Sequence, residues 1–173
     1  MIIKIKIMDL YNKYQNGLLN RRNFLKKLSL LVGGSASAIT LLPLIEKDYV
    51  KETINNLPAQ FKLLLFSISK KEIKNKKDGM RNGITTGEAY TIYKETCKEV
   101  CFKSLTQRRI SDIISELDTL GILITRVVSL GRHGKTKEIL LSVSPEELIS
   151  FLQEDDLIGG LSGFKIKDQA RLF

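Results

Sequence analysis

The sequence is poor in the residues that most often build metal sites, disulfide frameworks and nucleophilic active sites. It has one histidine, His133, and two cysteines, Cys97 and Cys101, in 173 residues. Without a second imidazole or a thiol at ligand spacing, His133 supports neither a zinc site nor a histidine-based triad, and we expect an exposed turn residue. The cysteines lie four residues apart in a helical pattern, which favours reduced, packed thiols over a disulfide or a CxxC pair. The composition therefore predicts no metal and no cofactor.

Two catalytic signatures are also missing. No Gly-x-x-x-x-Gly-Lys-Ser/Thr phosphate loop occurs, and in the nearest segment, residues 131–136, the glycines are too close together and lie between two expected strands. No Gly-x-Ser-x-Gly or Gly-x-Cys-x-Gly nucleophile elbow occurs either. These absences predict a protein that is not an enzyme and has no small-molecule substrate.

Basic residues are in excess. The chain holds 28 Lys and Arg against 19 Asp and Glu, a formal net charge of +9. Residues 1–56 contribute 9 − 4 = +5 and residues 57–173 contribute 19 − 15 = +4, so the excess is not confined to one tail. This balance suits a polyanion, either nucleic acid or an anionic membrane surface, and charge alone does not choose between them.

Residues 1–55 read differently from the rest of the chain. The run NRRNFLKK at residues 20–27 resembles a twin-arginine motif, and 18 uncharged residues follow at 28–45. Residues 10–50 as a whole resemble the leader of dienelactone hydrolase family proteins, although Asn20 stands where the motif usually has Ser or Thr. We expect an apolar N-terminal helix that packs on the following domain or lies on a membrane, or else an export signal; 18 residues is at the short limit for spanning a bilayer of about 30 Å.

The main domain is expected at residues 57–156. Its first helix begins near Pro58 and is followed by a Lys-rich run, KKEIKNKKDGMRNG, which we interpret as a solvated loop. Thr85 and Glu88 form a capping box for the second helix. Apolar strands are expected at 122–130 and 136–143, a last helix from Ser144, and an irregular tail at 157–173.

The third helix, residues 106–120, organises this domain. One face carries an apolar stripe at helical spacing: Ile110, Ile113, Ile114, Leu117 and Leu120. Thr106 is the expected N-cap, which places Arg108 and Arg109 in the first turn. Cations are unfavourable at the positive end of a helix, so the two arginines predict an anionic partner. Asp112 and Glu116 are expected to orient the arginines.

Three helices, a two-stranded wing and a final helix form the order of a winged helix, so the predicted fold class is mainly α with a small β-hairpin. Three segments carry a more specific likeness: ITTGEAYTIYKETCKEV, LTQRRISDIISELDTLGIL and RVVSLGRHGKTKEILLSVSPEEL. Together and in this order, they closely resemble the C-terminal domain of archaeal origin-recognition and cell-division-control initiator ATPases.

The resemblance implies duplex DNA binding at replication origins, with the third helix in the major groove and the wing tip in the minor groove. It assigns eight DNA-binding residues: Thr106, Gln107, Arg108, Arg109, Ser111, Arg132, Lys135 and Lys137. It also implies replication proteins as partners and a cytoplasmic, nucleoid-associated location. Because the family's ATPase module has no counterpart in the sequence, the chain resembles a detached part of an initiator. Two alternatives stay open: a winged-helix transcriptional regulator, and an exported or membrane-anchored protein.

Overall fold

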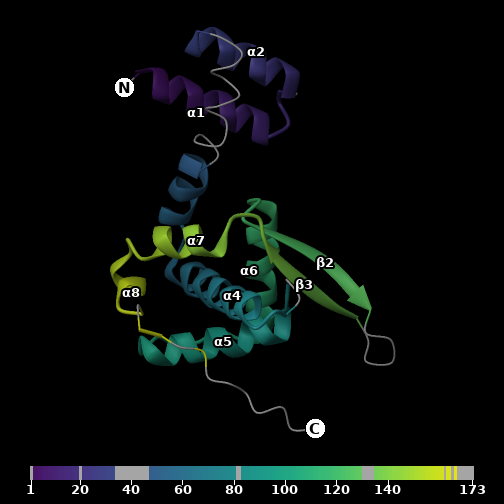
Figure 1. Cartoon of the computed structure of the whole chain (residues 1–173), viewed down its shortest axis with the longest axis vertical. Helices are drawn as coiled ribbons and strands as arrows, with labels where there is room; N and C mark the ends of the chain where they lie inside the picture. Colours follow the sequence, from purple (N-terminus) through teal and green to yellow (C-terminus); the bar gives the residue numbers. More distant parts are fainter. Residues whose placement is uncertain are drawn as a thin grey trace. The chain divides into compact units, whose positions relative to one another are not determined.

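The chain divides into two compact units, Met1–Thr53 and Ile54–Phe173. The computed structural model in Figure 1 describes residues 2–19, 21–33, 47–80, 83–129, 135–161, 163–164 and 166. Within these residues no helix is both long enough and apolar enough to cross a membrane. Most of the segment 28–45, considered above as a membrane attachment, falls in 34–46 and lies outside the described residues.

The first unit contains a pair of helices, α1 (Ile2–Gln15) and α2 (Arg21–Val32), that pack against each other. Four buried side chains form their shared core: Leu10, Tyr11, Phe24 and Leu28. Tyr14 stacks on Phe24 with ring centroids 4.8 Å apart. The two helices belong to the expected N-terminal segment 1–55, and of its apolar run 28–45 the structure describes only residues 28–33. Phe24 and Leu28 of the leader-like segment are core residues because they lie four apart, on one helix face.

The second unit has a mainly helical fold with one small sheet. Its elements are, in chain order, α4 (Ala59–Lys77), β1 (Ile84–Thr85), α5 (Thr86–Glu99), α6 (Gln107–Thr119), β2 (Leu123–Ser129), β3 (Lys135–Leu141), α7 (Pro145–Leu152) and α8 (Asp156–Gly159). The three strands are antiparallel in the order β1-β3-β2. This arrangement confirms the predicted winged-helix class and adds β1, a two-residue strand that was not expected.

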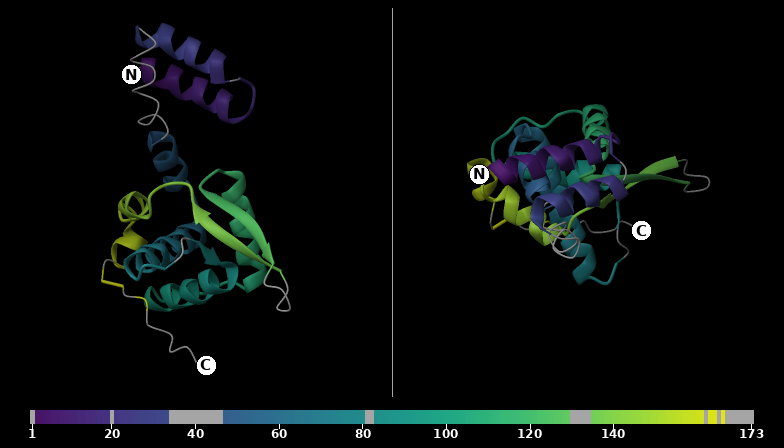
Figure 2. Two further views of the ribbon diagram at one scale, coloured as in Figure 1. Left: turned by 45° about the vertical axis from the view of Figure 1, so that its right-hand side comes forward. Right: turned by 90° about the horizontal axis from the view of Figure 1, so that it is seen from above.

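Helix α4 lies at the centre of the unit, between α5 and α7 (Figures 1 and 2). Every residue from 61 to 69 except Lys62 is buried, so this stretch is covered on all sides rather than along one stripe. Its buried Ser67 hydroxyl is satisfied: its one proton is shared between the Leu63 carbonyl, 2.7 Å from Ser67 Oγ, and Thr96 Oγ1 at 2.9 Å. The second bond joins α4 to α5 and removes the cost of an unpaired polar group in the core.

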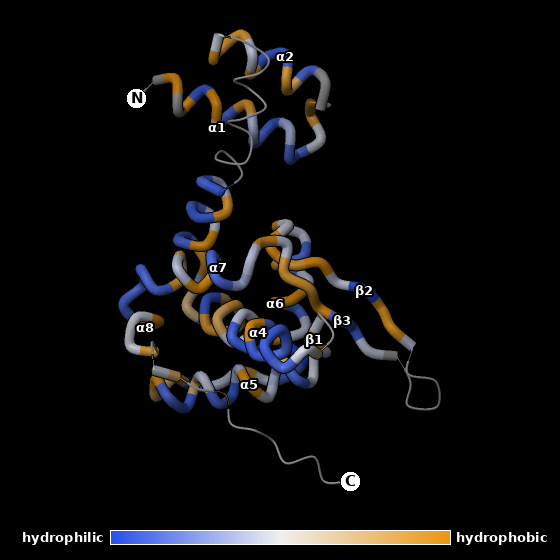
Figure 3. Tube along the Cα trace, in the orientation of Figure 1, coloured by the Kyte–Doolittle hydropathy of each residue, from blue (hydrophilic) through white to orange (hydrophobic). Residues whose placement is uncertain are grey.

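Two expectations about irregular segments were wrong. The Lys-rich run was expected to be a loop, but α4 continues to Lys77, and Figure 3 shows it changing from hydrophobic to hydrophilic along its length. Lysine and glutamate are good helix formers, and the positive charges of lysines in the last turn interact favourably with the helix dipole. The tail was expected to be irregular from 157, but α8 occupies Asp156–Gly159, and Ile158 and Leu161 are buried.

The C-terminal ends of α5 and α6 have the same backbone geometry but use different residues for it. In both, the third residue beyond the helix donates its N–H back across the last turn: Phe102 to the Cys97 carbonyl at 2.8 Å, and Ile122 to the Leu117 carbonyl at 3.1 Å. The residue immediately before this donor must adopt positive φ, which favours glycine. After α6 this residue is Gly121, with φ of 72°, but after α5 it is the exposed Cys101, with φ of 53°. The chain therefore carries local strain at Cys101.

We expect Cys101→Gly to raise the free energy of unfolding by about 0.5 to 1 kcal/mol, because glycine relieves this strain at some entropic cost in the unfolded chain. Urea denaturation would measure the gain. Cys101→Ala is the matched control, since it removes the thiol but keeps the Cβ. An equal gain in both variants would attribute the effect to the thiol instead.

Helix α8 is tied to α4 by one ion pair. Lys62 donates to Asp155 Oδ2 at 2.7 Å, with the two side chains only 12% and 30% exposed. Asp155 also caps α8 by accepting the Leu157 N–H at 3.0 Å. The hydrogen bond from Lys62 is the main reason that the pKa of Asp155 is lowered. The carboxylate thus stabilises the folded state in its charged form.

Asp155→Asn should lower the free energy of unfolding at pH 7 by about 1 kcal/mol, because asparagine can cap the helix but cannot pair with Lys62. The depressed folded pKa means that this contribution exists above the unfolded pKa of about 3.9 and disappears as pH falls through the folded value. Denaturation of parent and variant at pH 7 and at pH 2 to 3 should therefore show a difference only at the higher pH. Asp156→Asn, a neighbouring exposed acid, should behave as the parent does at both.

Candidate nucleic-acid interface

The segment that leads into α6 is held in place by a tyrosine and a glutamine. The hydroxyl of buried Tyr93 donates to Gln60 Oε1 and accepts the Leu105 N–H at 3.1 Å. The amide of Gln60 donates to the Lys103 carbonyl at 2.9 Å. Burial raises the pKa of Tyr93, so the hydroxyl keeps its proton. These bonds from α4 and α5 define where α6 begins.

Thr106 is the N-cap of α6, as predicted. Its side chain accepts the Arg109 N–H at 3.4 Å. The cap places Gln107 and Arg108 in the first turn, where both are exposed. The first turn contains no acidic residue.

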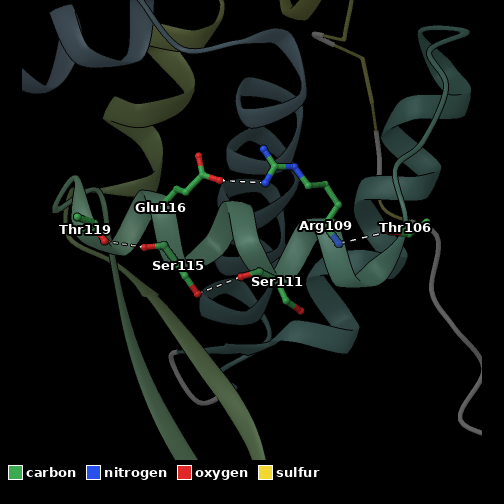
Figure 4. A network of polar contacts seen from close by, with 6 residues as sticks. All are labelled: Thr106, Arg109, Ser111, Ser115, Glu116 and Thr119. Atoms are coloured by element: carbon green, nitrogen blue, oxygen red, sulfur yellow. Dashed lines mark hydrogen bonds and ion pairs between the residues drawn. The ribbon is translucent and has the colours of Figure 1, made fainter.

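The two arginines of the first turn have different environments. Arg109 Nη1 donates to Glu116 Oε1 at 3.1 Å along the outside of the helix (Figure 4). Arg108 makes no hydrogen bond or ion pair with any residue that the structure describes. Of the two cations, Arg108 is thus the one available to an external anion.

A ladder of hydroxyls runs along another side of α6. Ser111, Ser115 and Thr119 each donate to the backbone carbonyl four residues earlier, at 3.2, 3.1 and 3.0 Å. Figure 4 shows Ser111, Ser115 and Thr119 on a different side of the helix from the Arg109–Glu116 pair. The three hydroxyl side chains on this side are small, so a DNA backbone can approach the helix closely here.

The hairpin of β2 and β3 is fastened to this same helix. Asp118 accepts both the N–H and the hydroxyl of Thr125, at 3.3 and 2.8 Å. Lys137 on β3 donates to Ser115 Oγ at 3.1 Å. The hairpin and α6 therefore form one continuous surface in which Lys137 is adjacent to the hydroxyl ladder.

On the other face of the hairpin, Glu138 is buried and pairs with Arg126. It also packs against Gly83, where a Cβ would stand 2.7 Å from Glu138 Oε1 and φ is +108°. Gly83 permits the close approach of the chain ahead of β1, which pairs with β3. Strand β1 thus adds a third strand to the β2–β3 hairpin and stiffens the base of the wing.

The structure places some of the eight predicted residues and leaves others undescribed. Thr106, Gln107, Arg108, Arg109 and Ser111 share the first turns of α6, and Lys137 reaches the same helix from β3. Lys135 begins β3, but its side chain is outside the described part. Arg132 and His133, together with the expected glycine turn, lie outside the described residues. The sequence gives no sign of the roles of Gln60 and Tyr93, because their hydrogen bonds to residues 103–105 follow no periodic pattern.

No group of three or more His, Cys, Asp or Glu in the described part of the chain is arranged to hold a metal ion. Burial raises the pKa of the Cys97 thiol, which suits a packed residue. What this surface offers is hydrogen-bond donors, a few cations and small polar side chains on an exposed helix.

The sequence model of a family described as "CDC6, C terminal winged helix domain" matches residues 52–150, more than half of the chain. The chain belongs to this family. The initiator resemblance found in the sequence is therefore confirmed, and α4 to α7 are the helices of a Cdc6-type winged helix.

Relatives of the Cdc6-type domain have replication names. ORC1-type DNA replication protein 4 of Haloarcula marismortui is 47% identical over 127 residues, which are 73% of this chain and 23% of that protein. The ORC1-type DNA replication protein of Pyrococcus horikoshii is 42% identical over 130 residues, covering 73% of this chain and 29% of the relative. This chain spans about a quarter of the length of these relatives.

A solved structure has a similar fold. The Aeropyrum pernix Orc1 protein, determined in complex with DNA, superposes with a TM-score of 0.64 at 38% sequence identity. The match covers 73% of this chain and 31% of that one. The neighbouring protein thus carries a similar domain in a structure that contains DNA.

Proposed function

We propose that residues 57–156 bind duplex DNA, with α6 in the major groove and the β2–β3 hairpin against the backbone and minor groove. The observation that carries the proposal is Arg108, an exposed arginine in the first turn of α6 with no partner in the described part of the chain. A guanidinium suits the guanine edge and phosphate alike. The DNA in the Aeropyrum pernix Orc1 complex supports the same ligand class.

The eight residues take different roles in this proposal. Gln107 and Arg108 contact base edges or the neighbouring phosphate. Arg109, through its pair with Glu116, and Thr106, through its cap, hold the first turn in place. Ser111 has a small side chain, which allows the wall of the major groove to approach α6 closely. Lys137, Lys135 and Arg132 supply positive charge from the hairpin.

We further propose that the domain acts in replication-origin recognition, in the cytoplasm and on the nucleoid, together with other replication proteins. In this role it needs no cofactor and has no catalytic activity of its own. The names of the relatives and the absence of a phosphate-loop motif from this sequence support this part of the proposal.

Selection of bound fragments from random duplex DNA tests the proposal. Enrichment of an origin-like inverted repeat is the expected result. Enrichment of a promoter-like site would favour a transcriptional regulator instead. Absence of any salt-dependent affinity for duplex would contradict DNA binding altogether.

The hairpin contact makes a separate prediction. Lys137→Ala should weaken binding to most sequences alike and reduce the logarithmic salt slope by about 0.9, the loss expected for one phosphate contact. Fluorescence anisotropy titrations at several salt concentrations would measure both quantities. Lys98→Ala, which removes an exposed lysine from the last turn of α5, is the charge-matched control. If both variants lower the slope equally, Lys137 contributes only through net charge.

A further inference from the structure

The outward face of α6 has a charged residue at its centre that the proposed function leaves unexplained. At 3.6 residues per turn, Arg108, Asp112 and Ser115 fall within about 60° of one another, opposite the buried stripe. Asp112 is exposed there. A carboxylate in the middle of a surface that approaches phosphates is repelled by them, so its place in a DNA-binding face needs a specific reason.

The other two acids that follow the first turn of α6 are engaged. Glu116 accepts from Arg109 at 3.1 Å, and Asp118 accepts from Thr125 at 2.8 Å. The expectation that Asp112 orients an arginine is not met: the arginine pairs with Glu116, and Asp112 makes no hydrogen bond or ion pair within the described residues. Asp112 is therefore the carboxylate of this helix that is free to meet an external donor.

The neighbouring hydroxyls make this part of the face a set of acceptors. Ser111, Ser115 and Thr119 direct their protons to backbone carbonyls, which leaves only lone pairs for outside contacts. Ser115 already accepts from Lys137. The first turn of α6 presents hydrogen-bond donors. After that turn, Asp112 is the strongest hydrogen-bond acceptor that the helix presents without a partner in the described residues. In the major groove, the groups that satisfy such an acceptor are the exocyclic amines of cytosine and adenine.

We propose that Asp112 is a specificity-determining residue, whose carboxylate accepts from the N4 amine of a cytosine in the major groove. The inference rests on the proposed function, since it requires α6 in that groove. Asp112 lies four residues, or about 6 Å, along the helix from Arg108. With base pairs about 3.4 Å apart, the cytosine is one or two base pairs from any guanine that Arg108 contacts.

Exchanging the acceptor tests this assignment. Asp112→Asn keeps the size of the side chain but presents a donor and an acceptor, the pair that recognises adenine N6 and N7. Duplexes would be prepared from the site selected by the parent protein, with each base pair replaced in turn. At one position the parent should prefer cytosine, by about 5- to 150-fold over other bases. Asp112→Asn should lose this preference and favour adenine there, with the other positions unchanged.

Glu99→Gln is the control, because it removes one negative charge from an exposed position at the end of α5, outside the proposed DNA contact. It should leave the preference for cytosine intact. An unchanged base profile in Asp112→Asn, or a uniform gain in affinity for every duplex, would overturn the assignment; the uniform gain would mean that Asp112 only repels phosphate. Failure of the parent protein to bind any duplex would instead overturn the proposed function.

Discussion

Removing the Arg108 guanidinium should cost about 1 to 3 kcal/mol of binding free energy on the selected DNA site and relax the sequence preference. The reason is that Arg108 is exposed in the first turn of α6 without a partner in the described residues, so its donors are not satisfied within the described protein. On unrelated duplex, the loss should be smaller. Anisotropy titrations of parent and Arg108→Ala on both DNAs would measure the two losses.

Arg108→Lys separates charge from geometry. Lysine keeps the positive charge but lacks the planar, two-pronged donor set of arginine. It should therefore retain most of the affinity for unrelated duplex and lose most of the sequence preference. If Arg108→Ala lowers both affinities equally, Arg108 only positions the domain on phosphate. Binding equal to the parent's in every variant would contradict the assignment of α6.

Tyr93→Phe should lower the free energy of unfolding by about 1 to 3 kcal/mol, the cost of leaving two partly buried polar groups without partners. Loss of the hydroxyl deprives both Gln60 Oε1 and the Leu105 N–H of their bonds. Because these bonds hold the segment that leads into α6, affinity for DNA should fall as well. Urea denaturation and DNA titration of the same variant would measure the two effects.

Tyr90→Phe is the matched control for this network. Its hydroxyl donates to the Leu105 carbonyl at a longer 3.4 Å from a partly exposed position. We expect a loss below about 0.5 kcal/mol, because water can replace such a bond. Equal losses in Tyr90→Phe and Tyr93→Phe would show that the segment is held by packing rather than by the Tyr93 hydroxyl.

Much of the domain follows from local rules in the sequence. The caps at Thr85, Thr106 and Ser144 each involve residues three apart, and the structure has a helix starting after each one. The apolar stripe of α6 is likewise a matter of spacing, and four of its five residues are buried. The two long strands end within two residues of their predicted limits. Such features depend on a few neighbouring residues, so their pattern can be recognised without the fold.

Tertiary structure alone decided which polar groups are engaged and which are free. Lys137 and Ser115, which are hydrogen-bonded to each other, are 22 residues apart in the sequence, and the hydrogen-bonded pair Tyr93 and Gln60 is 33 residues apart. The chain can enter β1 only because Gly83 has no side chain to clash with Glu138, which lies 55 positions later in the sequence. Short polar segments have many alternative partners in an unfolded chain, and only the packing of α4, α5, α6 and the hairpin selects one. The sequence by itself thus determined where α5, α6 and α7 begin, the two long strands and the face of α6, whereas packing determined β1 and how that face is joined to its supports.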